Sequence, residues 1–217
     1  MTPTHSHYYL LFIAYLLIGC TSPSPLRPDR WQFFRARDND STLNRPLLYR
    51  AQVPSHWKRK DPPSNQSIID TTEAICAFTI SEGQHSIRLT IHTFPILGNQ
   101  IRIPPQAQVA RWKGQFEELD PITTVTTKEA HGGFHGLFFE GEGIIEKTPI
   151  TVIGWSMQLA PSYARQLQQE DDGLNAYKRA DYTIKASGPP KLMKIHRSDI
   201  IAFAHSFELI DELPALP

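Results

Sequence analysis

The chain has 217 residues, with 22 Lys and Arg against 22 Asp and Glu, so its formal net charge at pH 7 is zero. This balance argues against a nucleic-acid binder, which would carry a basic excess or patch. Hydrophobic residues make up 40% of the chain, too many for a disordered protein, and the length suits one domain with appendages.

The first predicted element is an apolar segment at residues 8–19, which contains no charged side chain. As a helix it would be about 18 Å long, too short for a hydrocarbon core of about 30 Å and typical of a signal peptide. It ends in Leu17-Ile18-Gly19-Cys20, which resembles a bacterial lipobox. We therefore expect a signal peptide at 1–19, cleavage between Gly19 and Cys20, and a diacylglycerol on the Cys20 sulfur. The alternative is an uncleaved or conventional signal with an incidental cysteine.

A tether is predicted at residues 20–45, because three prolines between residues 21 and 28 favour an extended spacer. The same segment contains Trp31, Phe33 and Phe34, whose apolar side chains are not expected in a simple linker. These aromatic residues either pack on the domain as its first element or lie at lipid headgroups. The domain itself is expected at 46–210, with a short tail at 211–217.

Within the domain we predict up to seven strands, because short runs there are rich in β-branched residues or alternate between apolar and polar side chains. A turn at residues 81–84 makes a hairpin of the second and third, and Gly141-Glu142-Gly143 lies in the turn between the fifth and sixth. The polar stretch 167–174 is expected to be an exposed loop. The predicted strands are 47–53, 74–80, 86–94, 123–128, 134–140, 148–159 and 177–187.

Two helices are predicted. The first follows Pro104-Pro105 and ends at Pro121, with an apolar stripe formed by Val109, Trp112, Phe116 and Leu119. The second is capped by Ser198 or Asp199 and precedes the tail. Because most strand connections are too short for parallel crossovers, we expect an α+β fold: an antiparallel sheet of six or seven strands flanked by helices.

This layout resembles the PsbP-like family, whose fold is a central antiparallel sheet flanked by helices. The resemblance covers roughly residues 47–210 and implies a protein-binding or assembly role, with no active site and no cofactor to transfer. It is based on the order of the elements and on three short sequence motifs: Val53-Pro54 before Trp57, Arg111-Trp112 with Gln115, and Thr183-Ile184-Lys185-Ala186-Ser187-Gly188-Pro189.

The strongest candidate for chemistry is a histidine pair. His131 and His135 are an even number of residues apart, so in an extended segment both side chains can lie on the same side. Glu140 can then complete a metal or hydrolytic site. The neighbouring glycines argue against a helix and favour a plain turn with His131 in the loop. Glu140 and Glu142 are two residues apart, so in a strand they lie on one side and resemble the carboxylate pair of a general acid–base site.

Three further features have structural explanations. His92 is predicted on the solvent-exposed face of its strand. Cys76 lies in an apolar run and is interpreted as a core residue. Lys191, Lys194, His196 and Arg197 form a basic cluster before the last helix, either a solvated face or a contact for anionic lipid or an acidic partner.

Two hypotheses for the function remain open. The first is a non-enzymatic lipoprotein, held on a membrane by its N-terminal lipid, that binds another protein of the bacterial envelope. In a Gram-negative cell we expect it on the periplasmic face of the outer membrane, because Thr21 is no retention signal for lipoproteins. The second is a small-molecule or metal-binding domain, with or without hydrolytic activity, that uses His131, His135 and Glu140. No nucleic acid and no cofactor is expected in either case.

Overall fold

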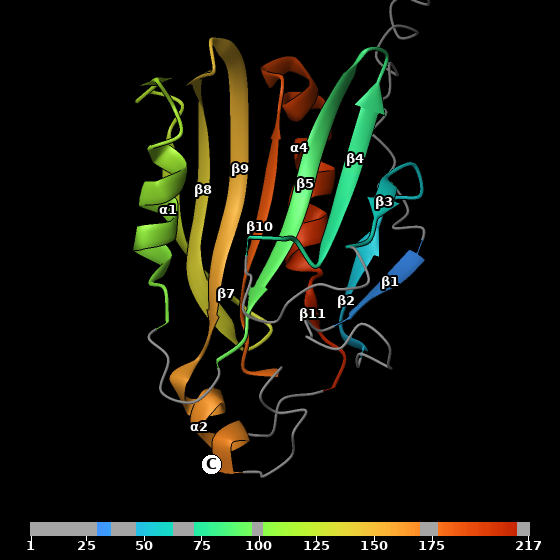
Figure 1. The fold of residues 1–217 in the computed structure, drawn as a ribbon, viewed down its shortest axis with the longest axis vertical. Helices are drawn as coiled ribbons and strands as arrows, with labels where there is room; N and C mark the ends of the chain where they lie inside the picture. Colours follow the sequence, from blue (N-terminus) through green and yellow to red (C-terminus); the bar gives the residue numbers. More distant parts are fainter. Residues whose placement is uncertain (1–29, 36–46, 63–71, 97–101, 170–177, 212–217) are drawn as a thin grey trace, which may run out of the picture.

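The computed structural model describes residues 30–35, 47–62, 72–96, 102–169 and 178–211, which form two antiparallel sheets and three helices (Figure 1). The predicted lipobox at residues 17–20 lies outside the described residues. Among the described helices, none is both long and apolar enough to cross a membrane.

The larger sheet has eight strands in the order β3-β4-β5-β10-β9-β8-β6, and β7 also pairs with β8. Every neighbouring pair is antiparallel. The strands are β3 (Lys58–Lys60), β4 (Cys76–Glu82), β5 (His85–Phe94), β6 (Glu118–Leu119), β7 (Val125–His131), β8 (Phe134–Ile145), β9 (Thr148–Leu159) and β10 (Asp181–Gly188).

The predicted fold class, an α+β fold with an antiparallel sheet flanked by helices, is confirmed. The sheet has eight strands instead of six or seven, because β3 and β6 have only three and two residues. Strands this short show no alternating pattern in a sequence.

A second sheet has the order β1-β2-β11, formed by Arg30–Arg35, Leu47–Val53 and Glu208–Leu209. Its first strand lies inside the segment predicted to be a tether. There Phe34 is fully buried against Phe203 and Phe207, whereas the side chains of Trp31 and Phe33 are both 44% exposed. The stretch therefore packs on the domain as its first element, the first of the two alternatives considered above.

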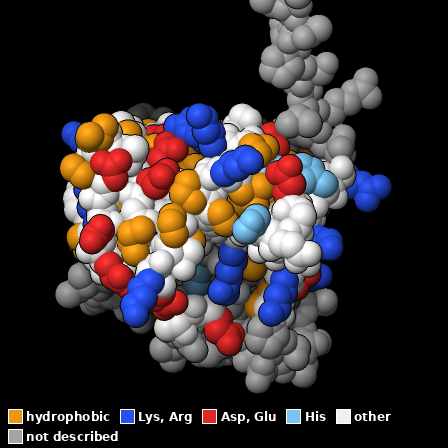
Figure 2. All heavy atoms as spheres, turned by 90° about the horizontal axis from the view of Figure 1, so that it is seen from above, with side chains coloured by type: hydrophobic (Ala, Val, Ile, Leu, Met, Phe, Trp, Pro, Cys, Tyr) orange, Lys and Arg blue, Asp and Glu red, His pale blue; other side chains and the backbone are white. Residues whose placement is uncertain are grey.

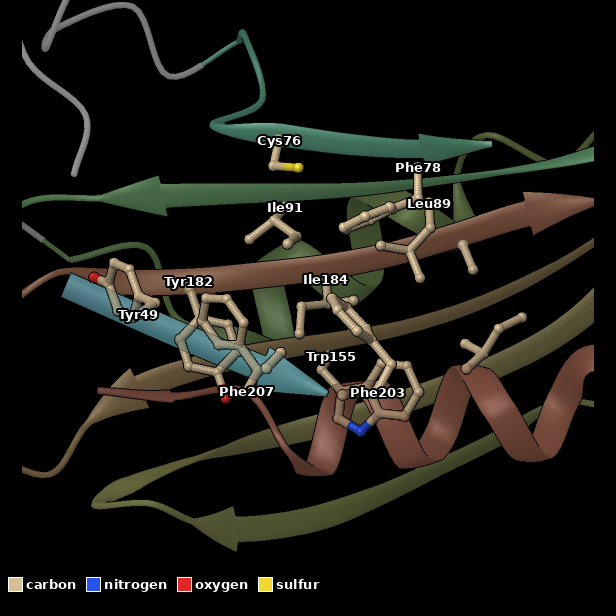
Figure 3. Close-up of a cluster of buried hydrophobic side chains, with 14 of the residues drawn as sticks. Tyr49, Cys76, Phe78, Leu89, Ile91, Trp155, Tyr182, Ile184, Phe203 and Phe207 are labelled. Carbon is tan, nitrogen blue, oxygen red and sulfur yellow. The ribbon is translucent and has the colours of Figure 1, made fainter. Parts of the chain in front are cut away.

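Helices cover both faces of the larger sheet. Helix α4 (Pro190–His205) packs behind the sheet in Figure 1, and the large core lies between them. Figure 3 shows Phe203 of this helix beside Trp155 and Ile184 of the sheet. Helix α1 (Pro105–Lys113) packs on β8 and β9 over a smaller apolar cluster, and α2 (Pro161–Gln169) follows β9. We call the two sides of the sheet the α4 face and the α1 face.

The predicted extent of the first helix is wrong. Helix α1 ends at Lys113, where the N–H of Gly114 caps the carbonyl of Ala110. Leu119 belongs to strand β6, although Phe116 still packs against the same small cluster as Trp112. Apolar spacing alone did not separate the end of a helix from a short strand that covers the same cluster.

The predicted turn at residues 141–143 is also wrong, because β8 continues to Ile145 and the turn is formed by Glu146 and Lys147, both with positive φ. The glycine at position 143 allows strand β6 to lie close to β8. A Cβ there would lie 2.0 Å from the Glu118 carbonyl oxygen of the neighbouring β6.

Two other predictions need correction. Residues 167–169 are not a loop but the last turn of α2, with Leu167 buried; the remainder of 167–174 lies outside the described residues. The last helix starts at Pro190 and not near Ser198, because a proline in the first helical position loses no hydrogen bond. The basic cluster of residues 191–197 is therefore part of α4.

Candidate functional site

A cavity of about 550 Å³ lies on the α1 face of the larger sheet, opposite the main core. Its size falls in the range of ligand pockets, roughly 300–1,000 Å³. Alternate residues of β5 and β10 contribute to it because side chains on one face of a strand recur with a period of two. The sheet and helix residues that line it include Arg88, Thr90, His92, Gln108, Arg111, Trp112, Gln115, Thr183, Lys185 and Ser187.

Trp112 fixes the helix that forms one side of the cavity. The indole is buried, and a Cβ on Gly154 of β9 would lie 2.7 Å from it. The missing side chain at position 154 therefore lets α1 come close to the sheet. This contact places Arg111 and Gln115, on either side of the buried tryptophan in the sequence, at the cavity.

Four cations line this cavity: Lys60 of β3, Arg88 of β5, Arg111 of α1 and Lys185 of β10. The last three act on one another electrostatically. The Lys185 ammonium donates a hydrogen bond to the Gln115 side chain at 2.5 Å. Burial lowers the pKa of Lys185, and the positive charges of Arg111 and Arg88 lower it further. The cavity thus holds like charges close enough to repel one another.

In the described residues, no carboxylate forms an ion pair with Arg88, Arg111 or Lys185. Asp61 and Glu73 also line the cavity, but Asp61 pairs with Arg59 at 2.7 Å. Within the described part of the chain, Arg88 and Arg111 make no ion pair and no hydrogen bond through their side chains. The arrangement can therefore accept negative charge from a ligand, because such a ligand would relieve the repulsion among the three cations.

The predicted histidine site is not formed. His131 and Glu140 lie on the α4 face, whereas His135 is exposed on the opposite face, because the tight turn at Gly132 and Gly133 pairs His131 with Phe134 and leaves His135 on the other side of β8. Glu140 is held by Arg197 of α4, with contacts of 2.7 and 2.8 Å. In the described residues these three side chains do not gather within metal-binding distance of one another.

His131 instead takes part in a polar contact at the edge of the core. It is the last residue of β7, next to a turn formed by Gly132 and Gly133, and its Nε2 lies 3.0 Å from the hydroxyl of buried Tyr182. Burial lowers the pKa of His131, with a further decrease from His205 and a partial offset from Glu129. A neutral imidazole shares one hydrogen bond with the tyrosine hydroxyl, and its tautomer decides which of the two groups donates.

We expect His131→Phe to lower the free energy of unfolding at pH 7.5 by about 1–3 kcal/mol, because the Tyr182 hydroxyl loses its partner. The variant should also lose pH dependence. In the parent chain the folded-state pKa is below the unfolded value, so the stability from neutral His131 is present above pH 6.5 and is lost as pH falls through the folded pKa. Urea titrations between pH 7.5 and 5 measure this slope. His135→Phe, at an exposed position, is the control, and equal slopes in both variants would contradict the assignment.

The remaining predicted residues have structural partners. Glu142 accepts a hydrogen bond from Thr151 at 3.2 Å and Glu140 is held by Arg197, although both carboxylates line one small cavity of about 200 Å³ on the α4 face. Cys76 is buried, and burial raises the pKa of its thiol to about 12, as expected for a core cysteine. Cys20, the predicted lipid attachment site, lies outside the described residues.

Comparison with known proteins gives structural similarity without a family. No family model and no curated protein matches the chain. LpqN of Mycobacterium tuberculosis, described as involved in cell envelope biogenesis, is 10% identical with a TM-score of 0.49, over 85% of this chain and 94% of that one. The cyanobacterial PsbP protein of Synechocystis sp. PCC 6803 is 10% identical with a TM-score of 0.47, over 89% and 98%.

Proposed function

We propose that the chain is a membrane-anchored lipoprotein of the bacterial envelope whose α+β domain is not an enzyme but a binding module for an anionic group. The observation that carries this proposal is the cavity on the α1 face, in which Arg88, Arg111 and Lys185 converge without a carboxylate partner. Both a small acid and an acidic side chain of an envelope protein present the chemistry that such cations bind.

The proposed anchor is compatible with the position of this domain. The first strand starts at Arg30, ten residues after Cys20, and ten residues span at most about 36 Å when fully extended. A diacylglycerol on Cys20 would therefore keep the cavity close to a bilayer, where the concentration of membrane-bound partners is high.

The second candidate function, a metal or hydrolytic site at His131, His135 and Glu140, has no geometric support. The His131 imidazole is held by Tyr182, the Glu140 carboxylate by Arg197, and His135 lies on the other face. We do not propose it further.

Binding to the cavity is tested with citrate and inorganic phosphate as anionic probes, by calorimetry on the full-length chain in detergent. We expect Arg88→Gln and Arg111→Gln to weaken binding about 10-fold or more each, because a hydrogen bond to a charged group contributes about 1.5–3 kcal/mol. The matched control is Arg165→Gln, which removes one positive charge from the exposed surface of α2. Equal affinities in all three variants, or no binding by the parent chain, would contradict the proposed cavity.

The anchor and the partner are tested separately. Cys20→Ser should release the protein from the membrane fraction, and mild cross-linking in native membranes should capture an envelope protein with the parent chain. Capture should decrease with Arg88→Gln and remain with Arg165→Gln. Equal recovery of Cys20→Ser in the membrane would contradict lipid anchoring without affecting the cavity.

A further inference from the structure

A second group of potential ligands lies on the α4 face, on the other side of the sheet from the cavity. It consists of His56, from the loop between β2 and β3, and of His196 and Asp199, three residues apart on α4. Figure 2 looks onto the end of the molecule where α4 begins, and histidine, acidic and basic side chains are exposed there together. No part of this group belongs to the proposed anion site.

The side chains lie near enough to one another to reach a shared metal ion after they rotate. One potential ligand atom from each of the three residues lies within 4.8 Å of the other two. His196 Nδ1 is 3.9 Å from Asp199 Oδ2, too far for a hydrogen bond. Tetrahedral Zn²⁺, with bonds of about 2.0–2.1 Å, holds its ligand atoms about 3.3 Å apart. Rotations of the side chains that shorten these separations by up to about 1.5 Å would bring the atoms to that distance.

The surroundings of His196 match those of a metal-binding histidine. A ligating imidazole usually directs its second ring nitrogen to a carboxylate, which fixes the ring orientation. Here the second nitrogen, Nε2, faces the carboxylate of Glu82 at the end of β4 at 4.0 Å, which is beyond hydrogen-bond distance. The ring is therefore flanked by Asp199 on the ligand side and by Glu82 on the other side.

Asp199 supplies the second argument. Its side chain is only 11% exposed, yet among the described residues no side chain or backbone group donates a hydrogen bond to it. A carboxylate so sheltered is costly without a partner, because ionised groups lose hydration when they are buried. A cation between Asp199 and the two imidazoles would provide that partner.

We propose that His56, His196 and Asp199 form a site for a divalent transition metal ion, with Zn²⁺ the ion that best suits two imidazoles and one carboxylate. The three ligands leave a fourth tetrahedral position for water on the exposed side of His56. The ion would fasten the loop after β2 to α4, next to the contact that Trp57 already makes with Phe203.

The test is titration of the full-length chain with ZnCl₂ and CoCl₂, followed by calorimetry, cobalt absorption and thermal unfolding with and without a chelator. We expect one equivalent of tightly bound Zn²⁺, a higher Tm with the metal, and a tetrahedral cobalt spectrum. His56→Ala and Asp199→Asn should each weaken binding at least 10-fold. Because His56 is exposed in a loop, its replacement should leave the fold intact.

His85→Ala, which removes an exposed histidine from the start of β5, is the matched control and should keep the parent affinity. No stoichiometric Zn²⁺ binding by the parent chain would overturn the proposal. Equal affinities in His56→Ala, Asp199→Asn and His85→Ala would also overturn it, because the metal would then be bound elsewhere in the chain.

Discussion

Replacing Arg102 by alanine is expected to lower the free energy of unfolding by about 3–5 kcal/mol, because it leaves a buried carboxylate without its cation. That carboxylate belongs to Asp181, the first residue of β10, whose side chain is only 8% exposed. Arg102 donates to it from two nitrogens and also donates to the Leu159 carbonyl oxygen at 2.7 Å. One guanidinium therefore joins the segment before α1 to the ends of β9 and β10.

The loss in Arg102→Ala should depend on pH. Burial raises the pKa of Asp181, and hydrogen bonds and charge from Arg102, with smaller effects of Leu159 and Gln158, oppose the increase. A carboxyl group with a raised folded-state pKa favours folding below its unfolded pKa of about 3.8, and this contribution is lost as pH rises through the folded value. Without Arg102 the folded pKa rises further, so the variant should lose less stability at pH 5 than at pH 7.

Urea unfolding at the two pH values measures this difference. Arg102→Ala combined with Asp181→Asn is the control, because the double variant contains no buried charge and should recover part of the lost stability at pH 7. A loss below 1 kcal/mol in Arg102→Ala, or the same loss at both pH values, would show that the ion pair does not hold these strands.

The strands were predictable where one face is buried and the other is not. In β5, Ile87, Leu89 and Ile91 are fully buried between more exposed neighbours, and this alternation is visible in the sequence. Two of the errors arose where glycine or proline serves a different purpose from its usual one. Gly143 lies inside a strand because another strand passes close to it, and Pro190 starts a helix directly after β10.

The candidate sites were less predictable than the fold, because they combine residues that only the topology brings together. Arg88 and Lys185 lie on wet faces of strands that the sequence locates, but that β5 and β10 are neighbours depends on the strand order. His56 and His196 are far apart in the sequence and lack metal-ligand spacing. His131 and His135 had suggestive spacing, but the hairpin placed them on opposite faces.

The second large effect is expected from Phe203→Ala, which should lower the free energy of unfolding by about 3–5 kcal/mol. The Phe203 ring is buried in an aromatic cluster, with ring centroids 5.3 Å from Trp57, 5.6 Å from Phe78 and 6.5 Å from Phe34. These three residues come from a loop and from strands of both sheets. Phe203 therefore joins α4 to both sheets at once.

Two controls separate this packing role from a general sensitivity to lost aromatic rings. Phe203→Leu keeps most of the volume and should cost less than about 1.5 kcal/mol. Phe33→Ala removes an equal ring from a half-exposed position on β1 and should cost far less than Phe203→Ala, because little apolar surface leaves the core. Equilibrium urea unfolding of the three variants gives the comparison. If Phe33→Ala and Phe203→Ala lost the same stability, burial of α4 against the two sheets would not be what holds the domain together.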